Sequence, residues 1–518
     1  MESYRDFARV YDEFMDQTPY DEWLLNILNI FKEYKIDKDA QVLDLGCGTG
    51  KMARKLAREG YQVTAVDNSM DMLEIAASEE DDHILYVLQD MVSLELPQQV
   101  DAAVSICDCM NYILEEEDLK EAFRRVREFL KEDGKYFVVR NDSALIAFKM
   151  TDKKDNIGFN IVAAHTDSPS FSIKPNTDMF DGNYMKLNVS GYGGMLNYTW
   201  LDRPLSLAGR VVTLKDGVYT KELINVDKDL LIIPSQAIHI NREANEKNAL
   251  NHQIDMLPIV SLNNEKNLED IIRDRLSSSG KDVEKICDYD LYLYNRDNAR
   301  YVGLNDEMIL APRLDDLASL FPAFNSFIES ENSNSINVLC AFNNEEIGSL
   351  TPQGADSTFL IDTLSRIAEA SNVNLLTALN NTLVVSADNA HAMHPNAGQK
   401  SDPTNKVLLN NGVVIKHHIN YTTDAVTSSL FKGICDNAKV PYQDFACKSD
   451  MRCGATLGGI SQSHVSVDSV DIGLPQLAMH STNETIGSKD VLYMYKSLLE
   501  FYDSTIVKEK NKIRILHK

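Results

Sequence analysis

The chain has 518 residues, of which 44% are hydrophobic, and it carries 78 Asp and Glu residues against 51 Lys and Arg residues. The resulting net charge of -27 argues against DNA, RNA or an anionic membrane as the main partner, because phosphate binding needs a positive surface. At about 100–200 residues per domain, this length predicts about three domains.

Eight cysteines are scattered along the chain without a paired CxxC motif. In a chain of this size, that pattern predicts reduced thiols in the cytosol and not a disulfide framework. The polar N-terminus shows no signal peptide, and no apolar run approaches the ~20 residues that a membrane helix needs. These features predict a soluble, cytoplasmic protein.

The first third of the chain alternates short apolar runs with amphipathic segments, as parallel βαβ units do. Strands are predicted at residues 42–45, 63–66, 85–88 and 102–106. Helices are predicted at residues 51–58, 70–77 and 119–130. This alternation predicts a doubly wound parallel sheet.

The turn after the first strand has the pattern DxGxGxG, which begins at Asp44 and includes Gly46 and Gly48. Glycines let the backbone approach a ligand closely, and this spacing differs from the GxGxxG of dinucleotide sites. An ordinary tight βα turn is the alternative interpretation. The pattern favours a loop whose backbone approaches a bound ligand closely.

Polar residues also follow the next two strands. Asp67 ends the second strand, where a carboxylate can accept hydrogen bonds from ribose hydroxyls, and Asp90 and Met91 follow the third. Together these motifs resemble class I S-adenosylmethionine-dependent methyltransferases over residues 1 to about 133. The resemblance implies a site for S-adenosylmethionine lined by Asp44, Gly46, Gly48, Asp67, Asp90 and Met91.

The pattern changes in the middle of the chain. From about Ile173 to Leu304 there are many short β-like runs, glycine and asparagine turns, and one helical stretch near residues 268–276. After Leu314 the α/β alternation returns, with a strand at residues 336–342. We therefore predict a β-rich domain at 172–305 inserted into a second α/β domain at 134–171 and 306–518.

Five short motifs between His165 and His480 carry side chains suited to a metal site. The first places Asp167 two residues after His165, directly after an apolar strand. A neutral imidazole is a good zinc ligand, and a carboxylate two residues on can orient its ring. Alone this motif is weak, because a single histidine in such a setting is more often structural.

The second and third motifs supply carboxylates. The pair Asp315-Asp316 could place a carboxylate between two cations, although a solvated helix cap is at least as compatible with it. Glu345 and Glu346 leave a buried strand, where adjacent glutamates are unfavourable unless positive charge lies nearby. One of them can bind a metal ion while the other takes a proton from water.

The fourth and fifth motifs complete the set. Asp388 is followed by His391 and His394 in one turn region, and His480 lies late in the chain. All five motifs fall at predicted strand ends, where an open α/β sheet gathers its ligands. Their combination predicts one shared metal site.

These motifs resemble the aspartyl aminopeptidase and vacuolar aminopeptidase I family of metallopeptidases, over about residues 134–518. The resemblance implies a dinuclear zinc-type aminopeptidase that releases acidic or neutral N-terminal residues from peptides, with manganese or cobalt as alternative metals. It assigns one metal to His165 and Asp388, the other to Glu346 and His480, and a bridging position to Asp315.

The resemblance also implies roles for the remaining residues of these motifs. Asp167 would support His165, and Glu345 would be the general base that activates water. Two positions depart from the family's pattern, because Asp316 stands where relatives often have Asn, and Asn483 replaces a usual Arg. Both departures bear on specificity more than on the metal site.

Further residues match family positions near the substrate, namely His391, Lys416 and Tyr421. Lys416 could face an acidic substrate side chain or the tetrahedral intermediate, or it could be a surface lysine. His239 matches a histidine that family members insert into a neighbouring subunit's site. The resemblance therefore implies a homo-oligomer, a dodecamer, with residues 172–305 as the oligomerisation domain.

The two resemblances meet near Gly134 without a linker. Tyr136–Val139 fits both the fifth strand of a methyltransferase and the first strand of the peptidase, and it cannot easily serve both. One hypothesis is that two genes are joined, by fusion or by an assembly error, at a short sequence motif that both families share. The other is that this strand serves one sheet and leaves the other sheet incomplete. The alternatives to a metalloaminopeptidase are an S-adenosylmethionine-dependent methyltransferase with a non-functional peptidase portion, and an inactive assembly protein.

Overall fold

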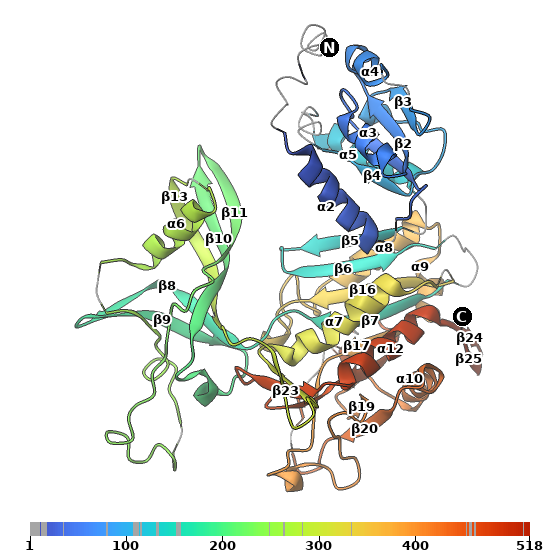
Figure 1. Ribbon diagram of the computed structural model, residues 1–518. Helices are drawn as coiled ribbons and strands as arrows, with labels where there is room; N and C mark the ends of the chain where they lie inside the picture. Colours follow the sequence, from blue (N-terminus) through green and yellow to red (C-terminus); the bar gives the residue numbers. More distant parts are fainter. Residues whose placement is uncertain are drawn as a thin grey trace. The chain divides into compact units, whose positions relative to one another are not determined.

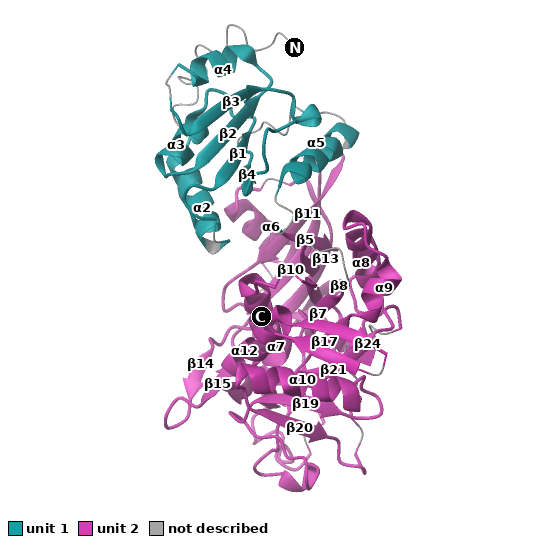
Figure 2. Cartoon of the chain, turned by 90° about the vertical axis from the view of Figure 1, so that its right-hand side faces the viewer, with its two compact units in different colours: residues 1–134 teal, residues 135–518 magenta. Residues whose placement is uncertain are grey.

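The computed structural model divides the chain into two compact units, Met1–Gly134 and Lys135–Lys518 (Figure 2). Residues 131–133, where the two predicted domains meet, lie outside the described residues. The structure describes residues 11, 18–34, 36–78, 81–106, 113, 116–130, 134–151, 157–247, 249–262, 265–281, 283–332, 334–451, 453–454, 458–459, 463–510 and 512–517.

The first unit contains a four-stranded sheet in the order β3-β2-β1-β4, with parallel neighbours throughout. Its central strands β1 and β2 are apolar runs with buried side chains, as expected for strands covered on both faces. The predicted doubly wound sheet is confirmed, and among the described residues it ends at β4. The elements are α2 (Tyr20–Glu33), β1 (Gln41–Leu45), α3 (Lys51–Arg58), β2 (Gln62–Asp67), α4 (Met70–Ala76), β3 (Ile84–Leu88), η1 (Met91–Ser93), β4 (Ala102–Val104) and α5 (Glu116–Phe129).

The second unit is built around an eight-stranded sheet in the order β20-β19-β21-β17-β7-β16-β6-β5. Its central strands β21, β17, β7 and β16 are parallel, and antiparallel strands flank them. Every side chain of β7 and β16 is buried. The strands are β5 (Lys135–Arg140), β6 (Ala144–Lys149), β7 (Phe159–His165), β16 (Ile336–Phe342), β17 (Leu383–Ala387), β19 (Val413–His417), β20 (Tyr442–Ala446) and β21 (Asp468–Gly473).

Helices cover both faces of this sheet (Figure 1). Successive side chains of a strand point to opposite faces, so Val162 joins one hydrophobic core while Ile161 and Ala163 join the other. The first core also contains residues of α7, α10 and α12, and the second contains residues of α8 and α9. The helices are α7 (Leu314–Glu329), α8 (Phe359–Ala370), α9 (Leu375–Asn380), α10 (Ala425–Ala438) and α12 (Asp490–Asp503).

The junction strand belongs to the second unit. Tyr136–Val139 lies in β5, which pairs antiparallel with β6 and places Phe137 opposite Ala147. Backbone hydrogen bonds can satisfy only one such partner on this side of the strand. The strand thus completes the edge of the eight-stranded sheet, and the first unit's sheet lacks it.

A β-rich region follows β7 in the chain and forms an antiparallel sheet in the order β11-β10-β13-β8-β9-β12 (Figure 1). Its core gathers Phe171, Trp200 and Leu291, with Ile272 of α6 packed against them. The predicted helix is confirmed as α6, which a capping box starts at Asn267. The elements are β8 (Ser170–Asp181), β9 (Tyr184–Tyr192), η3 (Asn197–Trp200), β10 (Leu205–Lys215), β11 (Val218–Asn225), β12 (Ile259–Ser261), α6 (Leu268–Ser278) and β13 (Lys285–Asn295).

A third, five-stranded sheet has the order β14-β15-β23-β22-β18 and joins segments that lie far apart in the chain. A short hairpin, β24 paired with β25, ends the second unit. The remaining elements are β14 (Arg300–Val302), β15 (Met308–Ala311), η4 (Glu345–Ile347), β18 (Ala390–His391), η5 (Gly398–Lys400), β22 (Pro475–Leu477), β23 (Glu484–Gly487), β24 (Thr505–Glu509) and β25 (Lys512–Leu516).

Two expectations about the whole chain have structural outcomes. None of the helices in the described part of the chain is both long and apolar enough to cross a membrane. The expectation of uniformly reduced thiols is wrong for one pair, because Cys447 and Cys453 form a disulfide. Cys453 follows Cys447 by six positions, and a turn after β20 brings them together.

Candidate metal centre

Three neighbouring parallel strands deliver polar side chains to one edge of the eight-stranded sheet. His165 is the last residue of β7, Glu345 and Glu346 follow β16, and Asp388 follows β17. Because β7 lies between β16 and β17, their carboxyl ends meet at the same edge. The sheet therefore gathers these residues as the sequence predicted.

Asp315 and His480 reach the site by a different route. Asp315 lies in the first turn of α7, just after β15, and His480 lies between β22 and β23. The expectation that all the motifs fall at strand ends of one open sheet is therefore wrong for these two. Both are held by Glu484 of β23, which accepts hydrogen bonds from the backbone N–H of Asp315 at 2.9 Å and of His480 at 2.6 Å.

The carboxylate of Asp315 lies between two imidazoles. Its Oδ1 atom is 3.3 Å from Nε2 of His165, and its Oδ2 atom is 3.6 Å from Nε2 of His480. On the far sides, Oδ1 of Asp388 is 4.0 Å from His165 Nε2, and Oε1 of Glu346 is 3.5 Å from His480 Nε2. The five predicted ligands thus form two groups that share Asp315.

The donor atoms of these groups fit divalent cations. His165, Asp315 and Asp388 offer ligand atoms within 4.8 Å of one another, and so do Asp315, Glu346 and His480. Oδ1 of Asp315 and Oε1 of Glu346 are buried and accept no hydrogen bond within the described part of the chain. Buried carboxylate oxygens without a partner are unfavourable, and a metal ion at their shared focus would satisfy them.

The protonation equilibria show that negative charge is crowded at the centre. Burial, together with the charge of Asp388, raises the pKa of Glu345 to about 7, and burial raises the pKa of Glu346 to about 8. Burial alone would lower the pKa of His480, but Asp315 and Glu346 raise it to about 9. Divalent cations would relieve this crowding of carboxylates.

Asp167 connects the imidazole of His165 to the glutamate turn. Its backbone carbonyl is 3.0 Å from Nδ1 of His165, which leaves the Nε2 atom to face Asp315. Its side chain accepts hydrogen bonds from the backbone N–H of Glu345 and of Glu346, at 3.1 and 3.2 Å. Such support fixes the ring orientation and the turn that follows β16.

The predicted substrate residues have different positions. Lys416 is buried, with Nζ 3.4 Å from Oδ2 of Asp388, so the surface-lysine alternative is wrong. Tyr421 is half-buried and lies within electrostatic range of Lys416 and Asp388. His391 is on β18, near enough for Lys416 and Asp315 to act on its charge, whereas His239 lies in an exposed turn between β11 and β12.

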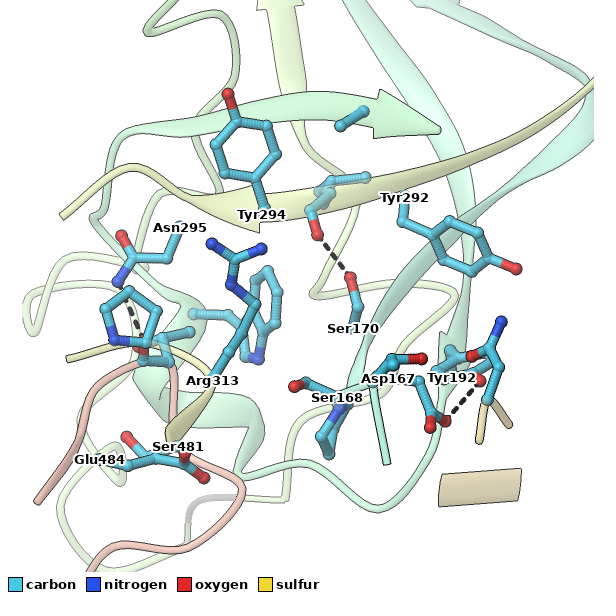
Figure 3. Close-up of a pocket in the computed structure, with 18 of the residues that line it drawn as sticks. Asp167, Ser168, Ser170, Tyr192, Tyr292, Tyr294, Asn295, Arg313, Ser481 and Glu484 are labelled. Atoms are coloured by element: carbon cyan, nitrogen blue, oxygen red, sulfur yellow. Dashed lines mark hydrogen bonds between the residues drawn. The ribbon is translucent and has the colours of Figure 1, made fainter. Parts of the chain in front are cut away.

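Sequence reasoning missed two supporting residues, Glu484 and Tyr192. Tyr192 donates a hydrogen bond to Asp167 at 2.7 Å, and burial raises the pKa of Glu484 to about 8. Both residues line a cavity of about 290 Å³ together with Asp167. Figure 3 shows the side chains that line it. The cavity lies where the β-rich region meets the metal centre, with Arg313 and Tyr294 also on its wall. Glu484 follows His480 by four residues, which was its only sequence signal.

In the first unit, Asp44, Gly46, Gly48 and Asp67 lie around the loop that follows β1. Gly46 and Gly48 have positive φ values of 78° and 53°, which glycine adopts without strain. The Asp67 carboxylate accepts hydrogen bonds from the backbone N–H of Gly48 at 2.8 Å and of Ser69 at 2.9 Å. Burial, helped by the charge of Asp67, raises the pKa of Asp44 to about 7.

The third strand of that unit leads to the last two predicted residues. Asp90 caps the short helix η1 by accepting a hydrogen bond from the backbone N–H of Val92 at 3.0 Å, and Met91 is the first residue of that helix. The capping role uses one carboxylate oxygen of Asp90.

The chain matches the family described as aminopeptidase I zinc metalloprotease (M18) over residues 100–502. A probable M18 family aminopeptidase 2 from Clostridium acetobutylicum is 44% identical over 388 residues, which cover 72% of this chain and 89% of that protein. The chain belongs to the M18 aminopeptidase family. M18 aminopeptidases are hydrolases, and the family's zinc chemistry fits the His and Asp cluster described above.

Solved M18 structures have the same fold. A cryo-EM structure of an Ape4 and Nbr1 complex matches with a TM-score of 0.68 and 35% identity, covering 72% of this chain and 77% of that chain. The S. cerevisiae mApe1 dodecamer matches with a TM-score of 0.62 and 25% identity, covering 72% and 87%. Residues 42–134 match a methyltransferase domain family, so both resemblances in the sequence are confirmed.

Proposed function

We propose that this M18 aminopeptidase uses two divalent metal ions to release single residues from peptide N-termini. The observation that carries the proposal is the position of Asp315, whose two carboxylate oxygens face the imidazoles of His165 and His480. A carboxylate that offers one oxygen to each of two ligand groups suits a pair of cations better than a single one.

The ligands divide between the two cations. His165 and Asp388 would hold one, Glu346 and His480 would hold the other, and Asp315 would be shared between them. Zinc suits the mixed imidazole and carboxylate donors, with manganese or cobalt as alternatives. When bound, the cations supply Lewis-acid polarisation of the scissile carbonyl and acidify the attacking water.

Glu345 is the proposed general base. It is half-buried beside the ligands, and the raised pKa of about 7 lets its carboxylate accept a proton near neutral pH. Asp167 accepts a hydrogen bond from its backbone N–H at 3.1 Å, which holds the turn that presents the carboxylate to the centre. It then returns the proton to the leaving amine.

Lys416 and Tyr421 border the substrate side of the centre. Lys416 lies against Asp388, so we propose that its ammonium orients this ligand and balances its charge. The preference for substrates with acidic or neutral N-terminal residues then depends on His391 and on the side chains around the metal centre. A free α-amine would bind at the metal centre, which explains the preference for chain ends.

We further propose that the β-rich region, with its expected range of 172–305, assembles the enzyme into a homo-oligomer. It exposes large apolar side chains, among them Ile240, Ile254 and Leu223, at 78%, 74% and 70% exposure. Large apolar side chains that are exposed together on one surface mark protein–protein contacts. The related S. cerevisiae protein is a dodecamer, and His239 in the same region would enter a neighbouring subunit's site.

Peptide trimming tests the proposal directly. The purified chain is incubated with a free peptide and with its N-acetylated copy, and the products are identified by mass spectrometry. We expect stepwise loss of single N-terminal residues from the free peptide only, abolished by a chelator. Cleavage inside either peptide, or trimming that resists removal of metal, would contradict it.

The second candidate is methyl transfer by the first unit. Gly46 and Gly48 of its glycine loop have positive φ values, and residues 42–134 match a methyltransferase domain. The Asp67 carboxylate, however, already accepts two backbone hydrogen bonds, which leaves it less free to bind ribose hydroxyls. Calorimetry with S-adenosylmethionine, beside an Asp67→Ala variant, decides whether the unit binds this cofactor.

A further inference from the structure

One further group of ligating side chains lies apart from the metal centre in the described part of the chain. A ring nitrogen of His418 and the sulfurs of Cys447 and Cys453 lie within 4.8 Å of one another. All three residues are half-buried, so small solutes can reach them. None of the three contributes to the two ligand groups that share Asp315.

The sheet brings these residues together. β19 and β20 are parallel, and their register pairs His417 with Ala446. The next residues along each strand, His418 and Cys447, therefore leave the sheet side by side. A turn then returns the chain so that Cys453 meets Cys447.

We propose that His418, Cys447 and Cys453 form a redox-controlled site for one soft divalent cation such as Zn²⁺. Two thiolates and one imidazole bind zinc in preference to hard cations, and water can fill the fourth position. While the disulfide is intact, neither sulfur is a thiolate. The site is therefore open to the cation only in the reduced chain.

The switch needs a reductant of the dithiol class. The dithiol transfers two electrons and two protons to the Cys447–Cys453 bond, which breaks to give two thiols, and the dithiol itself closes to a disulfide. Cation binding then releases both thiol protons as the two thiolates coordinate. A reducing cytosol would keep the pair in the thiol form.

The site also touches the border of the metal centre. The ring of His418 lies 5.4 Å from the ring of Tyr421, which in turn lies within electrostatic range of Lys416. A cation that fixes the His418 ring would thus restrict the neighbouring tyrosine. The site's own ligands remain separate from the catalytic ones, so its occupancy can be measured without reference to activity.

Metal analysis of the full chain tests the proposal. Protein is either reduced with a phosphine or left oxidised, exposed to zinc, desalted and analysed for zinc per chain. We expect the reduced wild-type chain to hold about one ion more than the oxidised chain. A Cys447→Ser/Cys453→Ser double variant should hold the same amount after both treatments. Equal zinc contents of reduced and oxidised wild type would overturn the proposal.

Thiol protection provides a second readout that needs no variant. Reduced wild type is alkylated with and without zinc, and modification is followed by peptide mass spectrometry. Zinc should slow alkylation of Cys447 and Cys453 by at least about tenfold, because coordinated thiolates are shielded. Cys287, a free half-buried thiol, is the internal control and should react at an unchanged rate. If zinc does not slow the alkylation of Cys447 and Cys453, the two residues form an ordinary disulfide without a cation site, and the proposal is wrong.

Discussion

The Oδ1 atom of Asp167 accepts a hydrogen bond from the backbone N–H of Glu345 at 3.1 Å. The Oδ2 atom accepts hydrogen bonds from Glu346 N at 3.2 Å and from the hydroxyl of Tyr192 at 2.7 Å. The same residue supports the ring of His165 through its backbone carbonyl. One aspartate therefore joins a proposed metal ligand to the proposed base.

We expect Asp167→Asn to lower zinc affinity by about 10- to 100-fold. The amide keeps only one acceptor oxygen, and its NH₂ group would face backbone N–H donors. Zinc affinity is measured by competition with a chelator. Tyr192→Phe removes a single hydrogen bond from the same carboxylate and should have a smaller effect. Equal affinities for wild type and Asp167→Asn would contradict this role.

Glu345→Gln should lower kcat by about 10²- to 10⁴-fold and leave the metal content unchanged. The glutamine matches the glutamate in shape but accepts no proton from water. Steady-state kinetics and elemental analysis are performed on the same preparation. Glu369→Gln, an exposed residue of α8, is the matched control and should retain full activity. A variant with normal kcat would assign the base to another residue.

Removal of one imidazole should remove one metal ion. We expect His480→Ala to bind one ion fewer than wild type, because Asp315 and Glu346 alone are too few ligands for tight binding. Native mass spectrometry counts the ions per chain. His394→Ala, in an exposed turn, controls for the loss of a histidine elsewhere. An unchanged count in His480→Ala would show that this residue holds no metal.

Subunit complementation tests the proposed role of His239. Neither His239→Ala nor Glu345→Gln should be active alone. After dissociation and reassembly together, mixed oligomers should regain part of the activity, since some sites would combine an intact Glu345 with a neighbour's intact His239. Mixtures that remain inactive, in a preparation shown by light scattering to have reassembled, would exclude action between subunits.

The stability of the first unit should depend on Asp44. Burial raises its folded-state pKa to about 7, against about 4 in an unfolded chain. The contribution of Asp44 to the free energy of unfolding is thus fully present below pH 4, and it is lost as the pH rises through 7. The free energy of unfolding falls by up to about 4 kcal/mol over this range. In Asp44→Asn, the free energy of unfolding should fall less as the pH rises. Unfolding is followed by the fluorescence of Trp23, the first unit's tryptophan, in a Trp200→Phe background. Parallel pH profiles for both proteins would contradict the shift.

The sequence predicted the elements that carry the site because each strand is a continuous apolar run. The predicted runs at 160–163, 336–342 and 382–387 end shortly before or beside His165, Glu345 and Asp388, and the structure places those ends together. The role of Glu484 could not be predicted, because its side chain acts on the backbone of residues that only the third sheet brings near. Strand periodicity carries no information about such contacts between sheets.

The junction strand and the disulfide are two further features that the sequence alone could not predict. Tyr136–Val139 fits two sheets equally well in sequence, and only its pairing with β6 decides which sheet it joins. The Cys447–Cys453 disulfide likewise depends on the parallel register of β19 and β20 and on the turn that follows. Spacing alone did not distinguish this pair from the other cysteines.

Activity as a function of bound metal tests the central claim most directly. The chain is stripped with a chelator, titrated with zinc or manganese, and assayed on aspartyl- and leucyl-chromogenic substrates at each metal content, beside Glu345→Gln. We predict that hydrolysis is lost on stripping, returns fully as two ions bind per chain, and stays absent in the variant. Full activity of a metal-free chain, or no activity of a folded chain with both ions bound, would contradict the dinuclear aminopeptidase.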